Sequence, residues 1–243
     1  MNRTEALDSI ELIRKVINST GADYSKGVRS CVFFLIYLAL NTVMNLAFTL
    51  YVRNGGYEHE IIRLYAGANA WIGFIFIAAG LAAYAFIRKK GDSVERAFAE
   101  IWIILPTICV IMQKMQFLIF GRNLNTIQST GFAGYIYGYN ESARQGNLML
   151  LAFLVFTCIL ATAVISKDKH IKKMAALFLV LSMGTFIFKD TNVSIMAVEN
   201  YQDTANTYNF NYAYLYGISL IFTAWVIYRL KTMGRQNGGE KKN

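Results

Sequence analysis

The apolar segment VIMQKMQFLIF at residues 110–120 contains one lysine with a glutamine on each side of it. The lysine is Lys114, and the two amides are Gln113 and Gln116. A second apolar run contains one carboxylate, Asp190. A charged side chain at the centre of a membrane helix costs about 2.5 to 3.5 kcal/mol on insertion scales, so each charge requires a partner, water or a ligand. The residue types therefore predict either a buried ion pair or a site for a small polar or anionic ligand.

The sequence contains no motif of a known catalytic or metal centre. It has no GxSxG elbow, no glycine-rich phosphate loop and no pair of intramembrane aspartates. The segment Glu58-His59-Glu60 lacks the i, i+4 histidine pair of a zinc-binding helix, and His170 is predicted on the opposite side of the membrane. We therefore expect no enzymatic activity, no metal and no cofactor. Three cysteines in apolar runs, without CxxC spacing, are typical of small buried residues: Cys31, Cys109 and Cys158.

The composition is that of a membrane protein. Hydrophobic residues make up 55% of the 243 residues and charged residues only 16%, whereas about a quarter of the residues of a soluble domain are charged. Six apolar segments approach the roughly 20 residues that cross a hydrocarbon core of about 30 Å. We therefore expect an all-α, polytopic membrane helix bundle. Its six transmembrane helices are predicted at residues 31–52, 66–87, 99–120, 147–166, 174–197 and 212–229.

Basic residues are distributed unequally between the two sides of the predicted bundle. Eighteen lie on one side, in residues 1–30, 88–96, 167–173 and 229–242, and four lie on the other. Because cytoplasmic loops are enriched in lysine and arginine, we predict that both termini are cytoplasmic. The formal charge of +9 is explained by these helix flanks, so the expected partner is the lipid bilayer, with no nucleic acid. The four residues on the outer side are Arg53, Arg63, Arg122 and Arg144.

The two intramembrane charges are predicted at the same depth. Lys114 and Asp190 each lie fifteen residues after the start of their span, near residues 99 and 175. At 1.5 Å per residue this is about 22 Å from the cytoplasmic side, in the outer third of the membrane. Other polar residues complete a layer at or near this depth: Asn41, Asn45, Asn69, Lys189 and Asn192.

Two interpretations of this polar layer stay open. In the first, Lys114 and Asp190 form a buried ion pair, and the amides join neighbouring helices for about 0.6 to 2 kcal/mol each. In the second, the layer lines an outward-open pocket among the first, second, third and fifth spans. We favour the pocket because Lys189 adds a second cation that a simple pair does not require. Helical geometry places Gln113 and Gln116 together and turns Lys114 elsewhere, so these side chains are expected to serve different neighbours.

Residues 2–20 are predicted to form a cytoplasmic amphipathic helix. Asn2 can cap this helix together with Glu5, and Gly21 can end it. Apolar residues recur every three or four positions, and the stripe either lies along the inner membrane surface or cytoplasmic loops, or docks a protein partner or a second copy of the chain. The organisation is thus predicted as residues 1–30 for this cytoplasmic segment, 31–230 for the transmembrane domain and 231–243 for a basic tail.

Two aromatic segments flank the predicted outer side. The segments GFAGYIYGYN at residues 131–140 and YNFNYAYLY at 208–216 place aromatic rings at alternate positions. Alternation makes no single helical face, so we predict extended approaches to the membrane. The rings are expected either in an aromatic belt at the outer headgroups or as a stacking platform for a sugar or another ring.

Packing signals occur on the second and third spans. Pro106 lacks an N–H group, which frees the carbonyl of Trp102 and favours a kink two turns before Lys114. The second span has a stripe of small residues that predicts close helix packing: Ala66, Ala70, Gly73 and Gly80.

The segment EALDSIELIRKVI is followed by a short polar stretch and then by the apolar run SCVFFLIYLALNTVMNLAF. This arrangement resembles the N-terminal fifty residues of a group of uncharacterised bacterial multi-span membrane proteins. The resemblance implies a bacterial plasma membrane and about six spans, and it implies no activity.

We expect a sensor or accessory subunit that binds a small polar or anionic ligand from outside, at a site centred on Lys114 and Asp190. A small-solute transporter is the first alternative, although the inner halves of the spans are nearly all apolar and no inverted repeat is evident. A structural membrane scaffold without a ligand is the second alternative.

Overall fold

Helices make up every element in the parts of the chain that the computed structural model describes, which are residues 24–54, 59–115, 133–196 and 201–239. The predicted all-α class is therefore confirmed for these residues. The predicted helix at residues 2–20 lies outside the described residues. The elements are η1 (Tyr24–Gly27), α2 (Val28–Arg53), α3 (His59–Lys90), α4 (Ser93–Ala99), the π-helical turn η2 (Glu100–Ile104), a helical segment at 105–115, α6 (Ala133–Ser166), α7 (Lys169–Met196) and α8 (Tyr201–Gly239).

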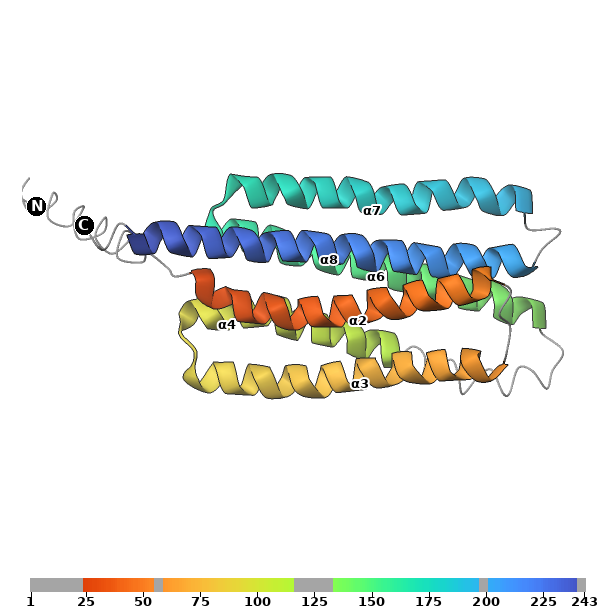
Figure 1. Cartoon of the computed structure of the whole chain (residues 1–243), viewed down its shortest axis with the longest axis horizontal. Coiled ribbons are helices and arrows are strands. Elements are labelled where there is room, and N and C mark those ends of the chain that lie inside the picture. Colours follow the sequence, from red (N-terminus) through yellow and green to blue (C-terminus); the bar gives the residue numbers. More distant parts are fainter. Residues whose placement is uncertain (1–23, 55–58, 116–132, 197–200, 240–243) are drawn as a thin grey trace, which may run out of the picture.

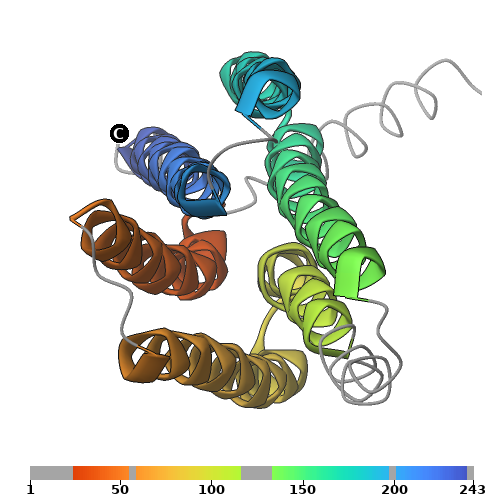
Figure 2. The same ribbon diagram turned by 90° about the vertical axis from the view of Figure 1, so that its right-hand side faces the viewer.

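The helices lie side by side in an elongated bundle (Figure 1). The pair α2 and α8 has the most extensive contact, while α7 packs on α6 and α8. An end view places α3 and α7 on opposite sides of the molecule (Figure 2). The beginnings of α2, α4 and α7 and the ends of α3, α6 and α8 gather at one end of the bundle (Figure 1). This end, which contains Lys26, Lys90 and Lys169, is called the basic end below.

Burial on α2 is inverted relative to a soluble protein. Asn41 and Asn45 are each 2% exposed, whereas Leu40 and Val43 are 49% and 66% exposed. Large apolar side chains are also exposed on the other long helices, for example Trp71 on α3. Water favours the opposite arrangement, but hydrocarbon accepts apolar side chains and requires polar groups to be satisfied inside. The burial pattern therefore indicates that lipid surrounds the bundle.

Four helical segments are long and apolar enough to cross a membrane, and they coincide with the first, second, fourth and sixth predicted spans. Their bounds are Tyr24–Tyr51, Gly67–Lys90, Gly146–Ser166 and Asn211–Gly234. The third and fifth predicted spans are helical in their described parts, residues 99–115 and 174–196.

The prediction that the aromatic segments are extended is wrong. Helix α6 begins at Ala133, within the first segment, and helix α8 runs without interruption from Tyr201 to Gly239, across the second. Tyr212 and Tyr216, four residues apart, share a helical face and stack with their ring centroids 6.4 Å apart. A helix in lipid can carry aromatic rings on several faces, so alternation does not require a strand there. Helix α8 also includes residues 231–239 of the predicted tail.

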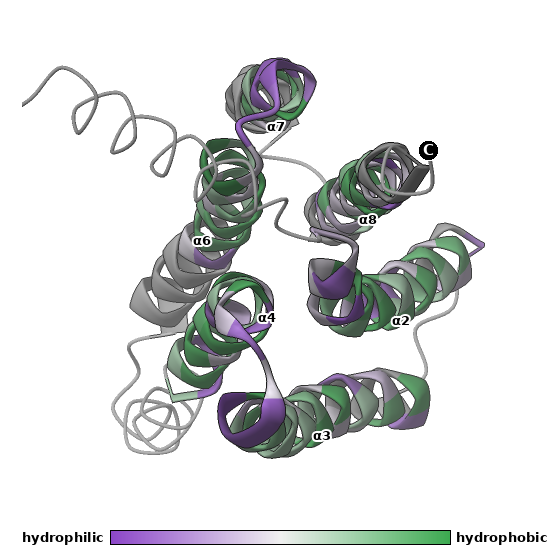
Figure 3. Cartoon of the chain, turned by 90° about the vertical axis from the view of Figure 1, so that its left-hand side faces the viewer, coloured by the Kyte–Doolittle hydropathy of each residue, from purple (hydrophilic) through white to green (hydrophobic). Residues whose placement is uncertain are grey.

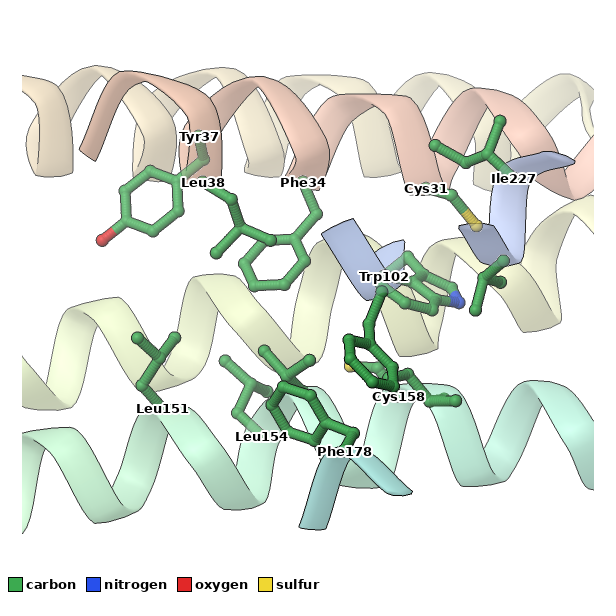
Figure 4. Packing of buried hydrophobic residues seen from close by; sticks show 14 of the residues in the cluster. Cys31, Phe34, Tyr37, Leu38, Trp102, Leu151, Leu154, Cys158, Phe178 and Ile227 are labelled. Carbon is green, nitrogen blue, oxygen red and sulfur yellow. The ribbon is translucent and has the colours of Figure 1, made fainter. Parts of the chain in front are cut away.

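The core is built around Trp102 of η2, which is fully buried. Its ring centroid lies 6.1 Å from that of Phe34 on α2, and its Nε1 donates a hydrogen bond to Thr162 Oγ1 of α6 at 2.8 Å. Figure 4 shows Trp102 among apolar side chains from several helices, together with Cys31 and Cys158. All three cysteines are buried and free, as predicted. Trp102 thus connects η2 to α2 by ring packing and to α6 by a hydrogen bond.

Two aspartates fix the helix connections at the basic end. Asp92 caps α4 by accepting from Glu95 N at 2.9 Å and also accepts from Lys26 Nζ, and these hydrogen bonds hold the pKa of its carboxyl below the usual value. Asp168 accepts from His170 N and from Arg229 Nε, each at 2.7 Å. Burial raises the pKa of the Asp168 carboxyl, but these hydrogen bonds and the charge of Arg229 together outweigh burial and lower it overall.

Candidate functional site

Lys114 lies against α3 and is positioned by a glycine. Its Nζ donates to the backbone oxygen of Asn69 at 3.2 Å and to Asn69 Oδ1 at 3.4 Å. Gly73, one turn further along α3, lies beneath the lysine stem, and a methyl group at this position would overlap Lys114 Cε. The missing side chain of Gly73 therefore makes the space through which the ammonium group reaches Asn69.

The charge of Lys114 has no acidic partner among the described residues. Lys114 is half-buried, its two acceptors are neutral oxygens, and none of the ion pairs in the described part of the chain includes it. An ammonium group has three N–H donors, so the two oxygens of Asn69 leave one donor for another group. The Lys114 ammonium group can therefore donate one more hydrogen bond to a further acceptor.

A second polar group connects α2 to α3. The side-chain amides of Asn41 and Asn45 each donate to the carbonyl four residues earlier, at 2.8 and 2.7 Å. The Tyr65 hydroxyl of α3 donates to Asn45 Oδ1 at 2.7 Å. The Tyr65 ring stacks on Phe48 of α2 with centroids 4.0 Å apart, which fixes the direction of the hydroxyl.

Helix α3 brings these two groups together. Tyr65, Asn69 and Gly73 follow one another at intervals of four residues, so they share one helical face. Tyr65 contacts Asn45 of α2, and Asn69 contacts Lys114 of the third predicted span. Lys114 and Asn69, which the sequence places in one polar layer, are thus in contact, and Tyr65 joins Asn45 of α2 to α3 one turn before Asn69. Tyr65, which bridges to Asn45, was not predicted from the sequence.

Other predicted members of the layer are not brought to Lys114 by the described contacts. Gln113 is half-buried beside Lys114 in the same helix. Asp190 belongs to α7, which packs on α6 and α8 and lies across the bundle from α3 (Figure 2). The Lys114–Asp190 ion pair stays a prediction. Four predicted members of the layer have side chains that the structure does not describe: Gln116, Lys189, Asp190 and Asn192.

The helix is irregular just before Pro106, where residues Glu100–Ile104 form a π-helical turn, while the predicted kink stays a prediction. Leu105 N–H bonds to Glu100 O, five residues earlier, instead of to Ile101 O. Pro106 has no N–H to offer, so Ile101 O has no backbone donor from either residue. The thiol of Cys158 on α6 donates to Ile101 O at 3.2 Å and satisfies this carbonyl. The π turn is therefore tied to α6 by a side-chain hydrogen bond.

The π turn also determines which residue faces α3. A five-residue turn contains one residue more than an α turn, which rotates the following helix by about 100°. In an uninterrupted α-helix, Gln113 would take the place that Lys114 occupies. The proline and its π turn thus direct the cation toward Asn69.

Several buried polar atoms were missed by sequence reasoning. Ser219 and Thr223 are fully buried on one face of α8, four residues apart, and this i, i+4 spacing of hydroxyls in an apolar helix was the available signal. Thr107 is fully buried against Gly80 of α3. Within the described chain, the buried side-chain atoms without a hydrogen-bond partner are Thr107 Oγ1, Asn147 Oδ1, Asn211 Nδ2, Ser219 Oγ and Thr223 Oγ1.

The fold and the site indicate a helical membrane protein with an apolar surface and hydrogen-bonded polar groups inside. Comparison of the chain with protein-family models, with curated proteins and with solved structures found no match. Among the described residues, no three histidine, cysteine or acidic side chains come together as a metal site would require.

Proposed function

We propose that this chain is a six-span plasma-membrane protein, with both termini in the cytoplasm, that binds a small anionic ligand from outside and acts as a sensor or accessory subunit. The observation that carries the proposal is the environment of Lys114: a half-buried ammonium group with neutral acceptors and no acidic partner among the described residues. A carboxylate, sulfate or phosphate group would supply the missing acceptor and the balancing charge.

The surroundings of Lys114 favour the recognition of an anion. Asn69 holds the ammonium group from one side, and Gly73 fixes the path of the lysine stem. Charges interact more strongly in the low-dielectric interior of a bundle than in water, so an unbalanced cation there attracts an anion. Tyr65 and Asn45 place a further pair of polar groups about one turn away.

The packing between Lys114 and the basic end supports a sensor or accessory subunit over a transporter. Trp102 and Phe34, which lie nearer the basic end, are fully buried and in ring contact. A transport path would have to pass this apolar core, and polar residues normally mark such paths. A ligand at Lys114 is therefore expected to bind and leave from the same side.

The proposal is tested by anion-dependent thermal stability. Wild type, Lys114→Met and the control Lys173→Met, which removes an exposed lysine at the basic end, are purified in a neutral detergent. Unfolding is followed in sodium succinate, sulfate, phosphate and chloride at equal ionic strength. We expect at least one of the first three salts to raise the melting temperature of wild type and Lys173→Met by several degrees relative to chloride, because binding to the folded state stabilises it. Lys114→Met should lose this increment.

Equal increments in Lys114→Met and wild type would contradict an anion site at Lys114. The scaffold would be favoured instead if no salt changed the melting temperature of wild type and Lys114→Met were more stable than wild type in every salt. Removing an unneeded intramembrane charge is expected to be neutral or stabilising in that case.

A further inference from the structure

A cleft of about 410 Å³ opens at the basic end, between the beginning of α2, the end of α3 and α4. Lys26, Arg29 and Lys90 lie along it, and Phe33 and Phe86 form part of its apolar wall. Lys90 is seventeen residues beyond Gly73 on α3, about 25 Å along the helix axis. The cleft is therefore separate from the Lys114 site, and conclusions about it do not depend on the function proposed for that site.

Positive charge exceeds negative charge in this cleft. Three cations line it, with Glu95 as the one carboxylate among its lining residues. Lys26 is paired with Asp92, but Arg29 is 88% exposed and its Nη1 is 4.0 Å from Glu95 Oε1, at the limit of an ion pair. Lys90 Nζ lies over the Phe86 ring, 5.1 Å from its centroid. Arg29 and Lys90 thus retain most of their capacity to bind an anion.

The cleft also spans the boundary between the apolar and polar parts of the molecule. Phe86 is 60% exposed and lies within the apolar stretch of α3 that ends at Lys90. Figure 3 shows hydrophilic residues at the connection from α3 to α4, directly beside the hydrophobic body of α3. Ala83, one turn before Ile87, continues the apolar wall away from the cations. A ligand that fills both halves must have an anionic group and an adjoining hydrocarbon chain.

We infer that this cleft binds one anionic phospholipid of the adjacent leaflet. The phosphate group lies between Arg29 and Lys90, and an acyl chain follows Phe86 and Ala83 into the membrane. A freely soluble phosphate would use the cations but leave the aromatic wall unoccupied. A neutral phospholipid would use the wall, but it would bring a cation of its own to Arg29 and Lys90.

The test compares the binding of defined lipids to the detergent-purified full chain by native mass spectrometry. Dioleoyl phosphatidylglycerol, dioleoyl phosphatidylcholine and glycerol 3-phosphate are titrated separately. The double variant R29Q/K90Q removes the two cations on either side of the inferred phosphate position, and the control K169Q/K172Q removes two exposed cations from α7 at the same end. Each basic residue near an anionic lipid surface contributes roughly a factor of five, so we expect R29Q/K90Q to bind phosphatidylglycerol about twenty-five-fold more weakly than wild type. The control and the charge-conserving R29K/K90R should bind it like wild type.

Three results would overturn the inference. Equal losses in R29Q/K90Q and K169Q/K172Q would mean that the lipid responds only to overall charge. Equal affinity for phosphatidylcholine would show that the cations do not select the lipid, and lipid-like affinity for glycerol 3-phosphate would show a site for soluble phosphate. Melting temperatures in neutral detergent verify that the variants fold. Lys114 is intact in all of these variants, so a negative result for the lipid cleft would not affect the test of anion binding at Lys114.

Discussion

At the scale of single residues, Gly73 decides where the charge of Lys114 can lie. The sequence identified this glycine as part of a packing stripe on the second span, and the structure shows that the side chain it admits is the lysine stem. Gly80 has the corresponding relation to the buried hydroxyl of Thr107. Small residues in membrane helices usually allow backbones to approach each other. Here they admit polar side chains from the third predicted span.

Gly73→Ala is predicted to displace the Lys114 amino group from Asn69, because the added methyl group would occupy the position of Lys114 Cε. The hydrogen bonds of the charged amino group are lost, while alanine favours the helix more than glycine does. The net loss of stability should be about 1 kcal/mol, seen as a lower melting temperature. Gly67→Ala on the same helix is the control, since a methyl group there meets nothing within 4 Å.

The same substitution in a Lys114→Ala background separates this effect from general helix packing. With the lysine stem removed, Gly73→Ala should be neutral or stabilising. A similar loss of stability in both backgrounds would show that Gly73 serves a contact other than the one with Lys114.

The polar residues themselves could be found from the sequence, but their pairing could not. Polar side chains in apolar runs are conspicuous, and helical rise placed Lys114, Asn45 and Asn69 near one depth. Pairing depends on rotation about the helix axis and on the order of helices around the bundle. Neither the π turn before Lys114 nor the position of α7 across from α3 has a signal in hydropathy.

At the scale of elements, η2 and Pro106 act together. Pro106 supplies no N–H, the π turn directs the N–H of Leu105 to Glu100 O, and the thiol of Cys158 donates to the carbonyl of Ile101 that both leave free. Trp102 in the same turn adds a hydrogen bond to Thr162, so α6 holds this irregular turn at two places. Single π turns within α-helices occur frequently at functional sites, and this one ends ten residues before Lys114.

Cys158→Ala is predicted to destabilise the protein by about 1 kcal/mol, because it leaves Ile101 O without a donor and removes a buried sulfur atom. In a Pro106→Ala background the loss should be smaller, since the new N–H at position 106 can bond to that carbonyl. Thermal unfolding of wild type, both single variants and the double variant gives the coupling between the two positions. Additive effects would show that the thiol does not compensate for the proline.

The existence of the helices was predictable, whereas some of their bounds were not. Apolar runs of about 20 residues gave the first, second, fourth and sixth spans close to their observed positions. Helix α6 begins fourteen residues before the predicted span at residue 147, and α8 begins eleven before the one at residue 212. Helical structure continues beyond the hydrocarbon level there, where hydropathy no longer reports on it.

At the scale of the whole molecule, the bundle has two chemically distinct ends. The basic end has ion pairs and aspartate caps at its connections, together with the cleft beside Arg29 and Lys90. Toward the other end, Lys114, Asn69, Tyr65 and Asn45 form polar contacts inside an apolar surface. The core around Trp102 separates the two regions. We propose that the basic end faces the cytoplasm and that the Lys114 layer opens to the outside.

Chemical access to position 114 tests whether the Lys114 site opens to the outside. Lys114→Cys is expressed in intact cells and treated with a membrane-impermeant anionic methanethiosulfonate reagent. Wild type serves as a control because Cys31, Cys109 and Cys158 are buried, and Ser93→Cys marks the basic end with an exposed position. We expect Lys114→Cys to be modified from outside, whereas Ser93→Cys should be modified only after the membrane is permeabilised. Modification of Ser93→Cys from outside, or a Lys114→Cys protein that stays unmodified in intact cells, would contradict an outward-open anion site.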